Sequence, residues 1–144
     1  MSEEIKKKGS SRNRQAGNGY EKSVARTVRE IGHADIKCSR ECSRKRDSQK
    51  VDLCSEDEDE NGRFYLNVQC KNLNTLAKYP KLLKELEMHN GRKYINVVFH
   101  KMTEKVGEKF MPRGEFAILN LDDFYRMMRL LKDNNLDKQL ILPK

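Results

Sequence analysis

The first regular pattern of apolar and polar residues along the chain predicts a helix. The stretch NGYEKSVARTVREIGH predicts a helix over 18–33, with Asn18 as a candidate N-cap and Gly32 as the stop. At about 100° per residue, one face of this helix collects apolar side chains and is predicted to be buried. That face comprises Tyr20, Val24, Ala25, Val28 and Ile31. Glu21 falls inside the same arc, where a carboxylate is costly unless it has a partner or a metal ion. The alternative is a glutamate favoured by its place near the helix N-terminus.

Three strand patterns follow. DIKCSR (35–40) and QKVDLC (49–54) are short, whereas RFYLNVQCK (63–71) alternates over its whole length. Its predicted core face is Phe64, Leu66, Val68 and Cys70, and its opposite face is Tyr65, Asn67, Gln69 and Lys71. If 49–54 and 63–71 form a hairpin, Asp52 lies on the same face as Gln69 and Lys71. The acidic run 56–60 and the Asn-Gly pair after it predict a solvated hairpin loop.

The second half of the chain predicts a helix, two strands and a final helix. The segments are a helix at 80–90, a buried strand at 93–100, a basic loop at 101–114, a strand at 115–120 and an amphipathic helix at 121–134. Met127, Met128 and Leu131 of the last helix are expected to be core. The predicted order is α-β-β-β-α-β-β-α, in one domain over 18–144. Residues 1–17 are expected to be a flexible basic arm.

The net charge of +8 is concentrated at one end of the chain. Residues 1–50 hold 14 Lys and Arg against 7 Asp and Glu, whereas residues 51–144 hold 16 against 15. Such a basic region is typical of proteins that bind a phosphate backbone, and a solubilising tail is the alternative. No apolar run approaches the roughly 20 residues of a membrane span, and no signal peptide is evident, so we expect no membrane association and a cytoplasmic location.

Four cysteines stand at 38, 42, 54 and 70 without a C-x2-C pair. Reduced thiols, some of them buried, are the expectation. A structural zinc ion is the alternative.

These patterns bring one set of chemically informative residues together: Glu21, Asp52, Gln69 and Lys71. Phosphodiester hydrolysis requires oxygen ligands that hold Mg²⁺, and it benefits from a cation beside the scissile phosphate. Two solvated residues on an exposed sheet face are the alternative for Gln69 and Lys71.

AGNGYE at the first helix, SRKRDSQKVDLC around the aspartate, and NVQCKN resemble the PD-(D/E)xK nuclease superfamily. Within it, they are most similar to archaeal-type Holliday-junction resolvases and related phage nucleases. The resemblance covers roughly residues 16–131. It departs from the family pattern at Val51, where the motif has proline, and at Gln69, where the motif has an acid.

The resemblance implies an α/β fold with a restriction-endonuclease-like core, in which helices flank a mixed central sheet. It implies a Mg²⁺-dependent DNA endonuclease, with Mn²⁺ as a substitute, that resolves branched or junction DNA in recombination as a homodimer. The cell would be bacterial, archaeal or a phage-infected host. Glu21, Asp52, Gln69 and the backbone carbonyl of Cys70 would be the metal ligands, and Lys71 the catalytic lysine. The expected DNA contacts are Arg12, Arg14, Arg40, Arg44, Lys45 and Arg46. The alternative hypothesis is a non-catalytic nucleic-acid-binding module with a decayed nuclease site.

Overall fold

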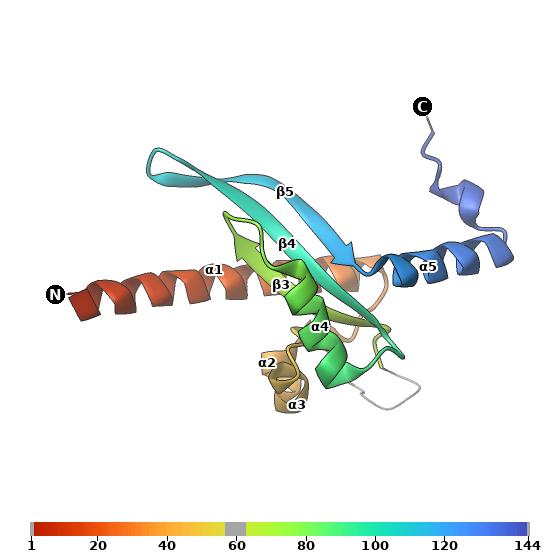
Figure 1. Cartoon of the computed structure of the whole chain (residues 1–144), viewed down its shortest axis with the longest axis horizontal. Coiled ribbons are helices and arrows are strands. Elements are labelled where there is room, and N and C mark those ends of the chain that lie inside the picture. The colour runs from red at the N-terminus through yellow and green to blue at the C-terminus, as the bar shows by residue number, and fades with distance from the viewer. Residues whose placement is uncertain (1, 57–62, 144) are drawn as a thin grey trace.

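A computed structural model describes the backbone of residues 2–56 and 63–143, and the side chains of residues 17–56 and 63–143. Figure 1 shows the arrangement of the helices and strands. In chain order they are α1 (Ser2–Ile31), β1 (Ile36–Cys38), α2 (Ser39–Cys42), α3 (Arg44–Ser48), β2 (Leu53–Ser55), β3 (Leu66–Leu73), α4 (Tyr79–Asn90), β4 (Ile95–Val106), β5 (Lys109–Leu119), α5 (Leu121–Asp133) and the 3-10 helix η1 (Asp137–Leu140). The chain is therefore a mixed α/β protein. It keeps the predicted order of the main elements and adds the short helices α2, α3 and η1.

Helix α1 begins at Ser2 and not after Asn18, so no break in the helix separates it from the predicted arm. The reason lies in the composition of 2–31, which contains no proline and many Lys, Arg and Glu residues that lose little freedom in a helix. The predicted buried face is confirmed for Tyr20, Val24, Ala25 and Val28. It is wrong for Ile31, which is 72% exposed at the rim of a hollow between α1 and the strands.

The strands form two sheets rather than one central sheet. β1 pairs antiparallel with β2, and a separate sheet has the order β3-β4-β5. In that sheet β3 is parallel to β4, and β4 is antiparallel to β5. The predicted hairpin between the second and third strands is therefore wrong, because β2 takes β1 as its partner. A backbone hydrogen bond from the N–H of Asp52, the residue before β2, to the Val68 carbonyl at 2.7 Å still connects this segment to β3. The acidic run of that hairpin lies, except for Glu56, outside the described residues.

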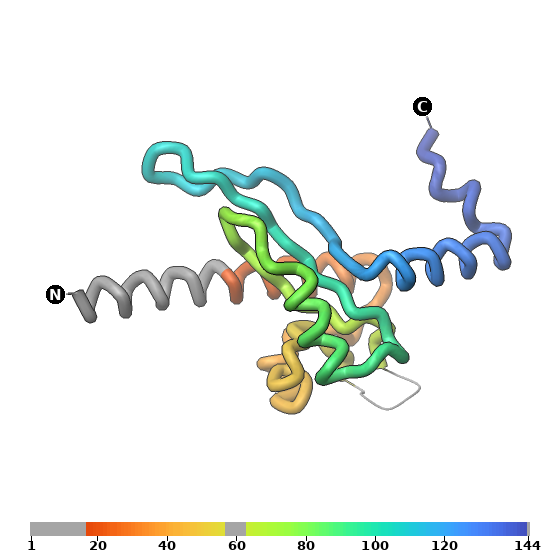
Figure 2. Tube along the Cα trace, viewed as in Figure 1, coloured from red at the N-terminus to blue at the C-terminus, as the bar shows by residue number. Residues whose placement is uncertain are grey.

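The predicted basic loop at 101–114 is instead most of a long β-hairpin. β4 and β5 remain paired out to Val106 and Lys109, and only Gly107 and Glu108 lie between them. Gly107 has a φ of 64°, which suits the tight reversal. Figure 2 shows this hairpin projecting past the rest of the sheet. Local strand pairing thus extends well beyond the apolar residues that sequence patterning detects.

Two helices cover the sheet from opposite faces. α1 packs through Val24 and Val28 onto a cluster that includes Val68 and Val97. On the other face, α4 packs through Leu83 and Leu86 against Val51 and Val98. The predicted core face of β3 is confirmed for Phe64, Val68 and Cys70, and Leu66 is half-buried.

The cysteines differ from the expectation. A disulfide joins Cys42 to Cys54, and Cys38 and Cys70 are free and buried. The two bonded residues meet because the Ser39 N–H donates to the Asp52 carbonyl at 2.8 Å and holds the start of α2 beside β2. Burial raises the pKa of both free thiols, which disfavours the thiolate that zinc requires.

Helix α5 leaves the body of the molecule directly after β5 (Figure 1). Its methionines Met127 and Met128 are exposed and Leu131 is half-buried, so the expectation that this stripe is core is wrong. The physical reason is that no described element lies over this side of the helix. Within the described part of the chain, no helix has the length and apolar composition needed to cross a bilayer.

Candidate metal centre at the edge of β3

Asp52 is held against the outer edge of β3 by its own backbone and its side chain. Its N–H donates to the Val68 carbonyl, and its carboxylate accepts from the Cys70 N–H, both at 2.7 Å. The two hydrogen bonds use the backbone groups of Val68 and Cys70, which point away from β4 toward the outer edge of the sheet. The aspartate that the sequence singled out therefore reaches β3 by edge pairing, without the predicted hairpin.

The backbone of Cys70 is oriented by the same contact. In an extended strand the N–H and C=O of one residue point to the same side. Since the Cys70 N–H points at Asp52, its carbonyl also faces the open edge of β3. The Cys70 carbonyl oxygen thus lies on the same side of β3 as the Asp52 carboxylate.

Gln69 and Lys71 flank this position along the strand. Gln69 is only 7% exposed, and its Oε1 is buried without a hydrogen-bond partner within the described structure. Lys71 is half-buried, and its charge acts on the carboxyl of Asp52. The alternative of two solvated residues is wrong for Gln69, because the opposite face of β3 is covered as well. An unpaired buried amide oxygen normally carries a penalty of a few kcal/mol, about 1–3, and therefore calls for a partner.

Glu21 reaches the same region from α1. Its side chain is only 12% exposed and forms an ion pair with Arg40 of α2. Its negative charge also contributes to the raised pKa of Asp52. The predicted position of Glu21 within the apolar arc is thus matched by an almost buried side chain, and its partner in this structure is an arginine.

The pKa of Asp52 is raised to about 7, mainly because burial disfavours the charged carboxylate. The Cys70 N–H lowers this pKa, Glu21 raises it and Lys71 lowers it. A carboxyl that titrates near neutral pH in a cluster of charged groups is typical of functional sites.

The expected DNA-contacting residues separate into three groups. Arg40 on α2 and Arg44 and Lys45 on α3 are exposed. The side chains of Arg12 and Arg14 lie outside the described residues. Their backbone belongs to α1.

Arg46 is different, because it is buried in a polar network that the sequence reasoning missed. Its guanidinium donates to Asn67 Oδ1 at 2.5 Å and to Gln49 and Asn90 at 3.0 Å. Asn67 in turn donates to Asn96 at 2.9 Å. The expectation that Arg46 contacts DNA is therefore corrected: it ties α3 to β3 and α4. The available signal was Asn67 and Asn96, two amides within strands whose neighbours are apolar.

The donor set at this edge is suited to Mg²⁺. Two carboxylates, an amide oxygen and a backbone carbonyl are all hard oxygen donors, which Mg²⁺ prefers. The unpartnered Gln69 Oε1 is the observation that fits a ligand role. The described residues contain no cluster of three or more His, Cys, Asp and Glu that could hold a metal ion, so a metal site here would need the amide and the carbonyl as ligands. Glu21 would be free to bind a metal ion only without its ion pair to Arg40.

Comparison of the chain with protein-family models finds no matching family, and comparison with curated proteins and with solved structures finds no match either.

Proposed function

We propose that this protein is a Mg²⁺-dependent DNA endonuclease, selective for branched DNA such as a four-way junction. The observation that carries the proposal is the buried, unpartnered Gln69 Oε1 on the strand that also binds Asp52 through the Cys70 N–H. Glu21 and Lys71 act electrostatically on the same aspartate. Oxygen ligands for a metal ion and a nearby cation are the groups that metal-dependent phosphodiester hydrolysis uses.

The residues have separate roles in this proposal. Glu21, Asp52, Gln69 and the Cys70 carbonyl would hold the ion, and Mn²⁺ would substitute. The bound ion would supply neutralisation of the phosphate charge and a more acidic water. Lys71 would stabilise negative charge on the scissile phosphate.

The exposed basic residues Arg40, Arg44 and Lys45 support a role in contacting the DNA backbone. They lie on α2 and α3, the two short helices between β1 and β2. Arg40 also contacts Glu21, so the proposed DNA surface and the proposed metal site adjoin. Selectivity for branched DNA rests on the resemblance to junction resolvases.

A nicking assay tests the proposal, with four-way junction, linear duplex and single-stranded DNA in Mg²⁺, Mn²⁺ or EDTA. Lys71→Ala should lose cleavage and keep DNA binding. Lys84→Ala, which removes an exposed lysine from α4, is the matched control and should cleave normally. Wild-type protein that cleaves none of these substrates with either metal, or Lys71→Ala that nicks at the wild-type rate, would rule out a nuclease site here.

A second candidate is a non-catalytic DNA-binding module, favoured by the pairing of Arg40 with Glu21. It predicts DNA binding that is unaffected by Mg²⁺. On this candidate the wild type does not cleave DNA and Gln69→Glu should create cleavage, whereas on the nuclease proposal the wild type cleaves and Gln69→Glu should preserve that activity. The same nicking assay separates the two candidates.

A further inference from the structure

The outer half of the β4–β5 hairpin has two chemically different faces. Residues directly opposite each other on paired antiparallel strands have their side chains on the same face. One face, called the aromatic face here, comprises Thr103, Lys105, Phe110 and Pro112. The other face comprises Glu104, Val106, Lys109 and Met111. An aromatic ring and a lysine thus share the first face, whereas an acid lies on the second.

The aromatic face borders a pocket of about 430 Å³ at the end of β3. Phe110 and Pro112 of the hairpin line this pocket, and Phe110 is 58% exposed. The amides Asn72 and Asn74, from the end of β3 and the turn after it, line it as well. Small-molecule sites typically have volumes of about 300–1,000 Å³, so the pocket is large enough for one nucleotide base.

The pocket and the face beside it carry positive charge. Lys101 lines the pocket, and the exposed Lys105 lies directly opposite Phe110. Among the residues that the structure describes, no Asp or Glu lines the pocket. An anionic ligand is therefore favoured there.

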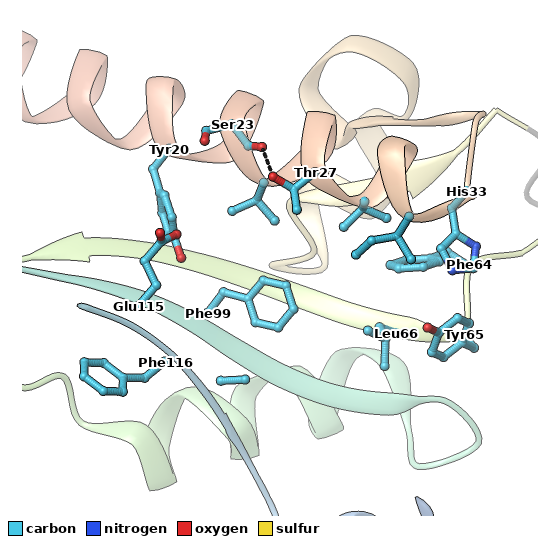
Figure 3. A pocket seen from close by; sticks show the side chains of 14 residues that line it. Tyr20, Ser23, Thr27, His33, Phe64, Tyr65, Leu66, Phe99, Glu115 and Phe116 are labelled. Atoms are coloured by element: carbon cyan, nitrogen blue, oxygen red, sulfur yellow. Dashed lines mark hydrogen bonds between the residues drawn. The ribbon is translucent and has the colours of Figure 1, made fainter. Parts of the chain in front are cut away.

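The acids near the hairpin are directed elsewhere. Glu104, on the opposite face, forms an ion pair with Arg113. Glu108 lies in the turn between the two strands. Glu115 lines the neighbouring hollow between α1 and the sheet, where it faces Tyr20 and accepts its hydrogen bond (Figure 3). None of these carboxylates opposes an anion at the aromatic face.

This combination of groups is suited to an unpaired nucleotide. An exposed aromatic ring stacks on a base, and lysines beside it attract the adjoining phosphates. Side-chain amides such as Asn72 and Asn74 can donate to and accept from the polar edge of the base. A base inside a paired duplex has both of its faces covered by its neighbours, so only an unstacked base can use Phe110 in this way.

The pocket also lies beside the proposed metal centre. Asn72 directly follows Lys71 and is two residues, or about 7 Å, beyond Cys70 along β3. A base in the pocket would therefore bring its own strand close to the edge of β3 that holds Asp52.

We propose that the aromatic face of the β4–β5 hairpin binds an unpaired base of DNA, which stacks on Phe110 while Lys101 and Lys105 contact the flanking phosphates. The inference rests on the proposed function in taking DNA as the partner. It deepens that function, because a branch point interrupts base stacking and a base-binding hairpin would select for it.

DNA binding in EDTA tests the hairpin without cleavage, with oligothymidine, a four-way junction and a fully paired duplex as probes. The wild type should bind the first two more tightly than the duplex. Phe110→Ala should weaken oligothymidine binding about five- to 150-fold, which corresponds to one lost stacking contact. Met111→Ala is the matched control, because Met111 is the next residue, is 45% exposed and lies on the opposite face. It should bind like the wild type.

A fluorescent variant gives a direct readout of stacking. The chain contains no tryptophan, so Phe110→Trp introduces a single reporter that can itself stack on a base. This variant should bind oligothymidine like the wild type, and its fluorescence should be quenched on binding. Met111→Trp should show little quenching. Phe110→Leu keeps apolar bulk without a flat ring and should bind as weakly as Phe110→Ala.

Salt dependence tests the lysines. Lys105→Gln should reduce the slope of log affinity for oligothymidine against log salt by about 0.7, the value for one phosphate contact on a single strand. Lys109→Gln, on the opposite face, should leave the slope unchanged. An unchanged slope for Lys105→Gln, or equal changes for both variants, would contradict phosphate contacts on the aromatic face.

The inference and the proposed function fail in different ways. Binding that depends on Phe110 without nicking in Mg²⁺ or Mn²⁺ would support the inference and rule out the nuclease. Normal nicking together with wild-type DNA affinity of Phe110→Ala would do the reverse. Equal losses for Phe110→Ala and Met111→Ala, absence of quenching in Phe110→Trp, or a wild type that binds none of the probes would also overturn the inference. Circular dichroism checks that every variant is folded.

Discussion

Replacing Asp52 by asparagine should make the protein more stable at alkaline pH, although it removes a proposed metal ligand. The carboxyl is largely buried, and its pKa is about 7 in the folded protein against an ordinary value of 3.8. Between these values the unfolded chain binds fewer protons than the folded one, so stability falls as pH rises. Asparagine carries no charge at any pH and can still accept the Cys70 N–H.

The size of the effect follows from the two pKa values. Each pKa step corresponds to about 1.4 kcal/mol, so the buried charge destabilises the wild type by about 4 kcal/mol at pH 8. The same relation gives about 3 kcal/mol at pH 6 and about 0.5 kcal/mol at pH 4. The free energy of unfolding of Asp52→Asn minus that of the wild type should therefore grow as the pH rises from 4 to 8.

Urea unfolding at the three pH values, without divalent metal, measures this difference. Asp47→Asn on α3 is the control, because Asp47 is exposed, and its unfolding free energy should stay close to that of the wild type. Adding Mg²⁺ at pH 8 should stabilise the wild type and leave Asp52→Asn nearly unchanged. A difference that does not vary with pH, or an asparagine variant less stable than the wild type at pH 8, would refute the reasoning about the buried carboxylate.

Substitutions at three further positions test Gln69, Arg40 and Arg46. Gln69→Glu adds a further buried carboxylate. It should lower the melting temperature without metal, yet show a larger rise in melting temperature with Mg²⁺ than the wild type. Gln69→Leu should lose the Mg²⁺ response and cleavage, and full activity of the leucine variant would exclude a ligand role. Arg40→Gln frees Glu21 from its ion pair and should weaken DNA binding. It should also tighten Mg²⁺ binding about two- to fivefold, which corresponds to the free energy of an exposed ion pair. Calorimetry that shows weaker Mg²⁺ binding would contradict competition between the arginine and the ion. Arg46→Met removes the centre of the buried network and should destabilise the protein by about 3 kcal/mol in urea unfolding, whereas Arg44→Met on the exposed side of the same helix should change little; equal effects would show that burial of Arg46 is unimportant.

Local patterning was sufficient for much of the fold. The arc of Tyr20, Val24 and Val28 predicted which face of α1 is buried, because the spacing of apolar residues alone determines which side chains share a helix face. Alternation in β3 likewise identified Val68 and Cys70 as core. The order of the main elements follows from the same local periods.

Pairing between distant segments was beyond such reasoning. The strand containing Leu53 could pair with either neighbour, and only the folded chain decided for β1. The alternation of apolar residues records which face of a strand is covered and carries no information on which strand lies beside it. The long β4–β5 hairpin escaped detection for a related reason: its outer half is exposed on both faces, so no apolar pattern marks it.

The candidate site divides in the same way. The sequence by itself determined that Gln69 and Lys71 share one side of a strand, since side chains alternate along any strand. Tertiary structure decided that Asp52 reaches this strand through the Cys70 N–H, that Arg40 pairs with Glu21, and that Arg46 is buried. These contacts join residues that are far apart in the chain, and their geometry depends on how α1, α2, α3 and β3 pack. Periodicity specifies the faces of individual elements, whereas the partners of charged side chains are set by the packing of all of them together.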